Sequence, residues 1–438
     1  MAISLFAAIA FGFAGSGFAP HVPVLSFGLL VATWLTSAAV FDCYDLRVAA
    51  RVRDSLPAAA RALFATSLVY FTVQLVIPEL IPPLGRNLTG VAAWFAIALV
   101  AISVARIAYV RLIAQAAERR RVALVGTPEC ERAASGLLKT IESEYNVVGL
   151  VLRDNAGSAS ADGLRVLGSH AELARIVSDE VIDEVIVADA GEDPATMDAL
   201  IGSYESGVIV RTLSDVFEEV TGRIPVQYLR PHWFAVLPRR PGGGRLYDRA
   251  RRVLDVLVAG AALLLLAPVL AALACAIWLD SPGPILYRQD REGYRGRCFS
   301  MVKFRTMQVD AERDGPRWAI QGDPRRTRLG KFLRPMRIDE LPQLWNVLTG
   351  EMSLIGPRPE RPCFVAELGQ TIPFYRARLL VRPGITGWAQ VRFAYTASAA
   401  DALEKLQYDL YYVKHRSPFL DLVIAFKTVG VLLHASGR

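Results

Sequence analysis

The string VLDVLVAGAALLLLAPVLAALACAIWL, Val253–Leu279, decides the architecture of this chain. At about 1.5 Å per helical residue, it is long enough to span a bilayer core of about 30 Å. Pro268 lies near its middle, where proline breaks or kinks a helix. Arginines flank both ends, which favours the same membrane face for each: Arg249, Arg251 and Arg252 before it, and Arg288, Arg291 and Arg295 after it. Composition alone leaves a fifth transmembrane helix and a re-entrant helix over about 250–279 equally open.

The chain before this run begins as a membrane protein. Of its 438 residues, 53% are hydrophobic and the mean hydropathy is +0.32, which is too apolar for an ordinary soluble protein. We expect the first apolar run to be retained, because no basic segment precedes it. Arginines gather after the second and fourth runs, which places both ends of the bundle in the cytoplasm. A four-helix transmembrane bundle is predicted within residues 1–113, from Ala2–Phe18, Val24–Phe41, Leu63–Ile77 and Val91–Val110.

Residues 120–238 alternate strand-like and helix-like segments, which predicts a Rossmann-like α/β domain with a parallel sheet. Only Gly126 remains of the three glycines that a dinucleotide site needs, so we expect the fold without NAD binding. The expected strands are Val122–Gly126, Val147–Leu152 and Glu184–Val187, and the expected helices are Pro128–Ile141, Ala171–Val177 and Met197–Tyr204.

A pair of adjacent carboxylates, Asp339 and Glu340, is the first chemical candidate, in the string RIDELPQLWNVL of Arg337–Leu348. Pro342 is tolerated only in a first helical turn, so a helix is expected to begin near Asp339. A helix start beside basic residues keeps a carboxylate ionised, and such a carboxylate can attack phosphorus while its neighbour holds Mg²⁺. The alternative is that Asp339 is only a helix cap.

Two further candidates lie downstream. The prolines of Gly356-Pro-Arg-Pro-Glu360 fix the backbone around Arg358, which prepares its guanidinium for a bidentate grip on phosphate, unless the segment is simply a rigid surface turn. Asp409 lies in a helical pattern and is either a ligand or a solvated acid.

Five strings together resemble the bacterial sugar transferase family, the monotopic phosphoglycosyl transferases, and they occur in the family's order over roughly 245–438. The layout of the whole chain resembles the long form of the family. The matching strings are Asp280-Ser-Pro-Gly-Pro284, Lys303-Phe-Arg-Thr-Met307, Asp339-Glu-Leu-Pro-Gln343, Gly356-Pro-Arg-Pro359 and Arg382-Pro-Gly-Ile-Thr-Gly387.

The resemblance implies a mostly helical catalytic domain over 245–438, with a re-entrant membrane helix broken at Pro268. Here Ala267 stands where the family usually has serine, which puts the kink angle in doubt. The implied nucleophile is Asp339, which forms a covalent aspartyl-phosphosugar intermediate, and Glu340 would ligate Mg²⁺ beside it. The resemblance also implies substrate-binding roles for Lys303, Arg305, Arg358 and Asp409.

The implied reaction moves a hexose 1-phosphate, with glucose or galactose expected, from a UDP-sugar to undecaprenyl phosphate and releases UMP. This is the first membrane step of exopolysaccharide or capsule synthesis. The resemblance implies a multi-pass protein of the bacterial inner membrane with its catalytic domain on the cytoplasmic face. The expected partners are the two substrates and the lipid bilayer, with no nucleic acid, and a homo-oligomer stays open.

Two other classes of function compete with this one. A catalytically idle scaffold of polysaccharide assembly would keep the fold, but the intact Asp-Glu and Pro-Arg-Pro strings oppose it. A transporter would need charged or broken membrane segments, and Arg106 is the only intramembrane exception in the predicted bundle. The five cysteines form no CxxC pair, so neither a zinc site nor a disulfide framework is indicated.

Overall fold

The structure is a computed structural model, and the chain in it divides into two compact units with a boundary near Arg121. The predicted segments Ala2–Phe18 and Pro128–Ile141 lie outside the described residues. The described residues are 24–43, 48, 52–76, 88–111, 120–126, 145–152, 165–188, 194–229, 244–309, 311, 325–393 and 399–433.

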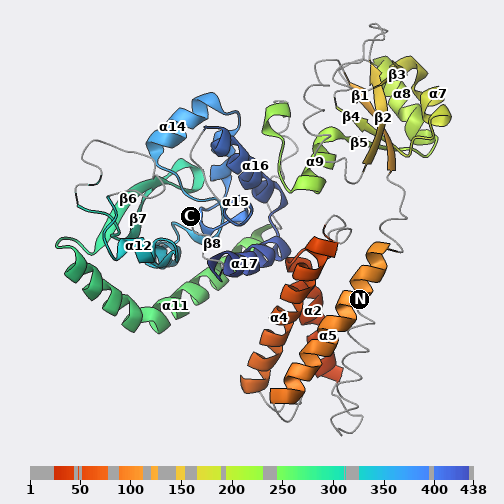
Figure 1. The fold of residues 1–438 in the computed structure, drawn as a ribbon. Coiled ribbons are helices and arrows are strands. Elements are labelled where there is room, and N and C mark those ends of the chain that lie inside the picture. The colour runs from red at the N-terminus through yellow and green to blue at the C-terminus, as the bar shows by residue number, and fades with distance from the viewer. Residues whose placement is uncertain are drawn as a thin grey trace. The chain divides into compact units, whose positions relative to one another are not determined.

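Three apolar helices make up the described part of the first unit: α2 (Val24–Val40), α4 (Val52–Val76) and α5 (Leu88–Tyr109) (Figure 1). Trp34 and Leu63 are buried in the core that these helices share. The helix predicted to start at Leu63 begins at Val52 instead, so Arg53 and Arg61 are helical and do not belong to a connection.

Arg106 is a buried cation among the described residues of this unit. Its guanidinium donates a hydrogen bond to the main-chain carbonyl of Cys43, just beyond the end of α2. A basic side chain that satisfies a carbonyl near a helix C-terminus has a structural role, so the bundle gives no sign of an ion pathway at this residue.

A five-stranded sheet forms the α/β part of the second unit, in the order β3-β2-β1-β4-β5. The β1–β4, β2–β3 and β4–β5 pairs are parallel, which confirms the predicted parallel sheet. This order is that of the first strands of a Rossmann sheet. The elements are β1 (Arg120–Gly126), β2 (Tyr145–Leu152), β3 (Val166–Ser169), η2 (His170–Glu172), α7 (Leu173–Asp179), β4 (Glu184–Val187), α8 (Pro194–Glu205), β5 (Ile209–Thr212), α9 (Leu213–Thr221) and η3 (Val226–Tyr228).

The remainder of the second unit is mostly helical, as predicted, with two small sheets (Figure 1). β6 and β7 form an antiparallel hairpin, and β8 and β9 form a parallel pair. The elements are α11 (Gly244–Asp280), β6 (Leu286–Glu292), η4 (Tyr294–Gly296), β7 (Cys298–Phe304), α12 (Gly330–Leu333), η5 (Ile338–Glu340), α13 (Gln343–Thr349), β8 (Ser353–Ile355), α14 (Pro362–Thr371), η6 (Tyr375–Leu380), β9 (Gly384–Thr386), α15 (Trp388–Arg392), α16 (Ala399–His415) and α17 (Pro418–Leu433).

The long apolar run forms one helix, α11, with Pro268 inside it. Figure 1 shows that α11 is bent along its length. Proline lacks the N–H that would bond to the preceding turn, which accounts for a bend at this position. Among the described helices, α11 and residues 52–75 of α4 are long and apolar enough to cross a membrane, and the apolar stretch of α11 is almost wholly exposed.

The β8–β9 pair joins two of the sequence strings that lie far apart in the chain. Gly384 donates its N–H to the Pro357 carbonyl at 2.9 Å, and Gly356 donates to Thr386 at 2.8 Å. A Cβ at Gly384 would lie 2.1 Å from the Gly356 nitrogen, so the two backbones can approach this closely only without side chains. The glycines of both strings therefore fix the position of the Pro-Arg-Pro turn.

The domain boundary predicted at residue 238 is not a packing boundary. Ile224 and Val226 are fully buried in a core with Tyr375, Leu406 and Leu410 of the mostly helical part. Trp388 donates its indole N–H to the Gly222 carbonyl at 2.9 Å. Gly222 ends α9 in the left-handed conformation, with the Trp388 ring against it. The segment after α9 therefore belongs to the core that supports the candidate site.

Candidate active site

The Asp339–Glu340 pair lies on a short 3₁₀ turn, η5. Arg337 enters this turn with a left-handed backbone, and the α-helix α13 begins only at Gln343, with Pro342 as its N-cap. The prediction that a helix starts near Asp339 is therefore displaced by one turn. Leu341 and Pro342 both keep right-handed helical angles, so the chain continues from the 3₁₀ turn directly into α13. Consecutive residues of a tight turn point in different directions, and this separates the two carboxylates.

Glu340 is held by arginine. Arg358 donates two hydrogen bonds to its carboxylate, at 2.6 and 3.2 Å, and Arg337 lies 3.7 Å from the same group. The Glu340 side chain is 12% exposed, whereas Arg358 is 30% exposed. Sequence reasoning had given the Arg358 fork to phosphate. In the structure the fork holds Glu340, and the Arg358 side chain stays partly exposed to solvent.

Asp339 has no such partner. It is 5% exposed, and among the described residues no side chain forms a hydrogen bond or ion pair with its carboxylate. Burial, together with the neighbouring Glu340, raises the pKa of Asp339 to about 6. Burial also acts to raise the pKa of Glu340, but Arg358 and Arg337 outweigh it and hold that pKa at about 2. The two adjacent carboxylates thus differ in pKa, because arginine forms direct hydrogen bonds with Glu340 alone.

Lys303 brings a cation to Asp339 from the hairpin. It lies on β7, with its ammonium 5.2 Å from the centre of the Tyr287 ring. Burial, and then Arg291 and Arg334, lower the pKa of Lys303 to about 8, whereas the Asp339 carboxylate acts in the opposite direction. The ammonium is therefore mostly charged at neutral pH. The structure brings Lys303, Asp339, Glu340 and Arg358 together, and we call these four the catalytic cluster.

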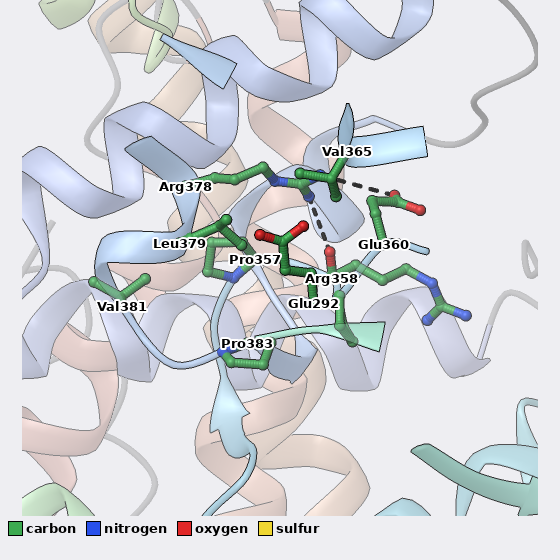
Figure 2. A pocket seen from close by; sticks show the side chains of 10 residues that line it. Glu292, Pro357, Arg358, Glu360, Val365, Arg378, Leu379, Val381 and Pro383 are labelled. Atoms are coloured by element: carbon green, nitrogen blue, oxygen red, sulfur yellow. Dashed lines mark hydrogen bonds and ion pairs between the residues drawn. The ribbon is translucent and has the colours of Figure 1, made fainter. Parts of the chain in front are cut away.

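Buried charged side chains bind the main chain of the Pro-Arg-Pro turn. Arg378 of η6 donates to the Arg358 carbonyl at 2.9 Å, and Arg291 of β6 donates to the Pro359 carbonyl at 3.0 Å. The Glu360 carboxylate accepts a hydrogen bond from Lys405. Figure 2 shows Arg378 reaching both the Arg358 carbonyl and Glu360, while the Arg358 side chain points away from them. The main chain of Arg358 is therefore fixed separately from its guanidinium.

Two predicted substrate-binding residues have structural contacts instead. Asp409 is 1% exposed, and its carboxylate accepts a hydrogen bond from Arg378 at 2.6 Å. Arg305 is 4% exposed and donates to the carbonyls of Ser281 and Pro282, at the end of α11. Neither reaches the Asp339 carboxylate. The charged groups of both residues are therefore already bound to protein partners, since a buried charged group must be paired or hydrogen-bonded.

Sequence reasoning missed Arg291, Glu360 and Arg378. Each lies in a stretch with many other charges, so nothing in composition marks it. The one available signal was the position of Glu360, which directly follows the Pro-Arg-Pro turn and so has a fixed direction.

The acidic pair fits a Mg²⁺ ion that is shared with phosphate. Among the described residues, no three His, Cys, Asp or Glu side chains gather to hold a metal by themselves. Mg²⁺ commonly takes only one or two carboxylates and completes its shell with phosphate oxygens and water. Asp339 carries no side-chain bond, and the Glu340 oxygens keep further lone pairs beyond those that Arg358 occupies.

Two family profiles match the sequence. The family described as bacterial sugar transferase matches residues 246–435, and a CoA-binding domain matches residues 39–209. The first match contains α11 from its third residue onward and the whole catalytic cluster. The second contains part of the first unit and most of the α/β part.

Similar proteins carry related names. An Aeromonas hydrophila UDP-N-acetylgalactosamine-undecaprenyl-phosphate N-acetylgalactosaminephosphotransferase is 40% identical over 58% of this chain and 60% of its own length. A Komagataeibacter xylinus undecaprenyl-phosphate glucose phosphotransferase is 35% identical over 71% of this chain and 58% of its own length. This chain thus spans less than two thirds of either. A Xanthomonas campestris UDP-glucose:undecaprenyl-phosphate glucose-1-phosphate transferase is 30% identical over 95% of this chain and 89% of its own length.

Proposed function

This chain belongs to the bacterial sugar transferase family, and from that premise we propose that it transfers a hexose 1-phosphate from a UDP-sugar to undecaprenyl phosphate. The observation that carries the proposal is the contrast within the acidic pair: Glu340 is locked to Arg358, whereas Asp339 is uncommitted and lies beside Lys303. Such a carboxylate, in a basic site, suits nucleophilic attack on phosphorus.

In the first half-reaction, a carboxylate oxygen of Asp339 attacks the phosphorus that carries the sugar. The bond from this phosphorus to the bridging oxygen breaks, and UMP leaves with the electron pair. Lys303 and the open side of Arg358 offset the charge of the diphosphate. The product is a covalent aspartyl-phosphosugar.

In the second half-reaction, a phosphate oxygen of the polyprenyl carrier attacks the same phosphorus. The bond to Asp339 breaks and restores the carboxylate, and undecaprenyl-diphospho-sugar leaves. No net proton transfer is needed, because both nucleophiles are anions. The site accordingly needs cations and a held carboxylate more than it needs a general base.

Asp339 and Glu340 would hold Mg²⁺, which neutralises phosphate charge when bound. The Glu340–Arg358 pair keeps one carboxylate in place for it. Residues of this chain would therefore supply both the nucleophile and part of the metal site.

UMP release tests the proposal directly. The protein in nanodiscs is incubated with UDP-sugar alone, and intact mass spectrometry follows the chain. A hexose phosphate adduct that forms without acceptor, and disappears when undecaprenyl phosphate is added, is the expected result. A protein that releases no UMP from any UDP-sugar would instead be an idle scaffold of polysaccharide assembly.

The identity of the hexose is the part of the substrate that remains to be assigned. The similar proteins are named as transferases of glucose or of N-acetylgalactosamine, whereas the sequence resemblance predicts glucose or galactose. A panel of UDP-glucose, UDP-galactose and UDP-N-acetylgalactosamine separates these, and we propose UDP-glucose as the preferred donor. We place the reaction at the first membrane step of exopolysaccharide or capsule synthesis.

The contacts of α11 support a re-entrant course through the membrane. At its beginning, Arg252 donates to the carbonyls of Val347 and Leu348 at the end of α13. At its end, the Asp280 carboxylate accepts the Leu329 N–H at 3.0 Å. A straight helix of this length would span about 55 Å, more than a bilayer core of about 30 Å. Because both ends bind one folded domain, we propose that both lie on the cytoplasmic face of the inner membrane.

Thiol labelling tests this topology. The native Cys298 is exposed and follows α11, and Arg245→Cys adds a site at its start. In cells whose other cysteines are replaced, a membrane-impermeant reagent should label neither site until the cells are opened. Labelling of one site alone in intact cells would show a full crossing and would overturn the re-entrant course.

A further inference from the structure

One face of the β6 strand carries a row of polar side chains directed toward the site. Tyr287, Gln289 and Arg291 alternate with the exposed Arg288 and Asp290. Alternation is the rule for a strand, so these three share one face. Tyr287 lies directly opposite Lys303 of β7 in the ladder. The row therefore ends at a member of the catalytic cluster.

Hydrogen bonds run along this row without a gap. Arg291 donates to the side-chain oxygen of Gln289 at 2.5 Å, and the Gln289 amide nitrogen donates to the Tyr287 hydroxyl at 3.0 Å. The Lys303 ammonium then lies over the Tyr287 ring. The amide uses its oxygen on one side and its nitrogen on the other, so each link has a definite direction.

The other arm of Arg291 reaches the Pro-Arg-Pro turn. It donates to the Pro359 carbonyl at 3.0 Å and lies 3.5 Å from the Glu360 carboxylate. Its side chain is only 14% exposed. A planar fork can bond in two directions at once, which a lysine ammonium on a flexible stem does poorly.

We infer that Arg291 is a positioning residue that fixes Lys303 and Arg358 relative to each other beside Asp339. One arm acts through Gln289 and Tyr287 on Lys303, and the other acts through the Pro359 carbonyl on the turn that carries Arg358. The inference rests on the proposed function, because the fixed pair would bind the diphosphate of the nucleotide sugar. Arg291 itself does not touch the reacting atoms.

The two sets of contacts that link Lys303 and Arg358 through Arg291, which we call the tie, have a physical purpose. Lys303, Arg291 and Arg358 are like charges that repel one another, and burial strengthens the repulsion. Without a fixed geometry the cations would separate when no diphosphate is bound. Held in advance, they need no rearrangement when charge develops on the leaving phosphate, which is the condition for effective electrostatic catalysis.

Branch-specific variants test the inference. Gln289→Leu removes both links of the Lys303 branch, and Tyr287→Phe removes the hydroxyl but keeps the ring under Lys303. Asp290→Asn, on the exposed face of the same strand, is the matched control. The measurement is the single-turnover rate of UMP release at saturating UDP-sugar, with the melting temperature in nanodiscs recorded in parallel.

Both branch variants should slow UMP release about tenfold, because each breaks the hydrogen-bonded connection between Arg291 and Tyr287. Arg291→Lys should slow it about 100-fold, since both arms lose their geometry. Melting temperatures of the branch variants should stay near wild type, and KM for the UDP-sugar should change less than kcat. Asp290→Asn should match wild type.

A double-mutant cycle separates positioning from general damage. In a Lys303→Met background, Gln289→Leu should have no further effect on the rate, because its target is gone. Additive losses in that background, or a wild-type rate in both single branch variants, would overturn the inference. If wild-type protein released no UMP from any UDP-sugar, the proposed function would fail instead, so the two failures are distinguishable.

Discussion

Two groups of charges in the second unit are built from the same residue types and do different things. In the catalytic cluster, Asp339 has no hydrogen-bonded side-chain partner among the described residues. At the contact between α9 and α16, Glu218 is equally buried but accepts hydrogen bonds from Lys414 at 2.8 and 2.9 Å and from His415 at 3.0 Å. The difference agrees with the proposed roles: Glu218 is bonded to its neighbours and holds structure, whereas the uncommitted Asp339 would be available for chemistry.

Helix α16 joins the two regions. Lys405 and Asp409 contact Glu360 and Arg378 behind the Pro-Arg-Pro turn. Other residues of the helix bind the segment that follows α9: Glu404 pairs with Arg223 at 2.7 Å, and the Gln407 carbonyl accepts the Ile224 N–H. We call this second region the α9–α16 joint. Perturbation of each region should therefore have a different signature.

Asp339→Asn gives the largest expected effect. An amide cannot form an acyl phosphate, so activity should fall at least about 1,000-fold. Because the Asp339 carboxylate is uncommitted, the melting temperature should hardly change. Intact mass spectrometry should show no hexose phosphate adduct. Activity above that limit, with an adduct elsewhere in the chain, would give the nucleophile role to another residue.

Arg358→Lys tests the fork within the catalytic cluster. The charge remains, but the bidentate hold on Glu340 is lost, and we expect kcat to fall about 100-fold. Glu340→Gln should give a similar loss and weaken the dependence on Mg²⁺, because an amide oxygen is a poorer ligand for a hard cation. Titration of activity against Mg²⁺ is the measurement. A wild-type Mg²⁺ curve for Glu340→Gln would place the metal on other groups.

Glu360→Gln tests the support behind the turn. Burial acts to raise the pKa of Glu360, but Lys405, Arg378 and Arg291 hold it at about 2. The stability that this carboxylate contributes is therefore fully present above its ordinary pKa and is lost as the pH falls toward 2. We expect a loss of about 3 kcal/mol at pH 7, since the cations around it become unpaired.

The pH dependence provides the check on this variant. The difference in melting temperature between wild type and Glu360→Gln should be constant from pH 7 to 5 and should shrink below about pH 4.5, the ordinary range of glutamate. Activity at neutral pH should fall about tenfold through the displaced turn. A difference that grew as the pH fell would contradict the ion-pair account.

The α9–α16 joint should give the smallest effect on chemistry. Glu218→Gln weakens its bonds to Lys414 and His415 and should cost about 1–2 kcal/mol of stability. Activity at low temperature should stay within about threefold of wild type, because no member of the joint reaches the reacting atoms. Glu219→Gln is the matched control, since Glu219 is its neighbour and 67% exposed. A Glu218→Gln rate as low as that of Arg358→Lys would remove the distinction between the two regions.

Sequence patterns predicted the parts of the fold that have strong periodicity. β1, β2 and β4 are buried strands and were expected; β3 and β5 were missed because each is a four-residue edge strand without a buried apolar run. The amphipathic helix α9 was also missed. The start of α4 was placed too late, because Arg53 and Arg61 were assigned to the connection that precedes the helix.

At the site, the sequence predicted which residues lie together better than what each one contacts. Asp339, Glu340, Lys303 and Arg358 do come together. Arg378 and Arg291 reach the Pro-Arg-Pro turn from elements that are distant in the sequence, and local patterns do not show this. The position of the turn, and with it the bidentate Arg358–Glu340 pair, could therefore not be predicted. Asp409 and Arg305 were given ligand roles, and both are buried in structural contacts.

The burial of Ile224 and Val226 among catalytic-domain residues has a consequence for how such proteins can be recombined. A gene fusion cut at the glycine-rich stretch after Pro238 would separate these two side chains from the core that they complete. The recipient would then carry an open apolar groove beside α16. The exchangeable module therefore begins upstream of α9, and evolution by domain shuffling should keep α9 and η3 with the transferase half.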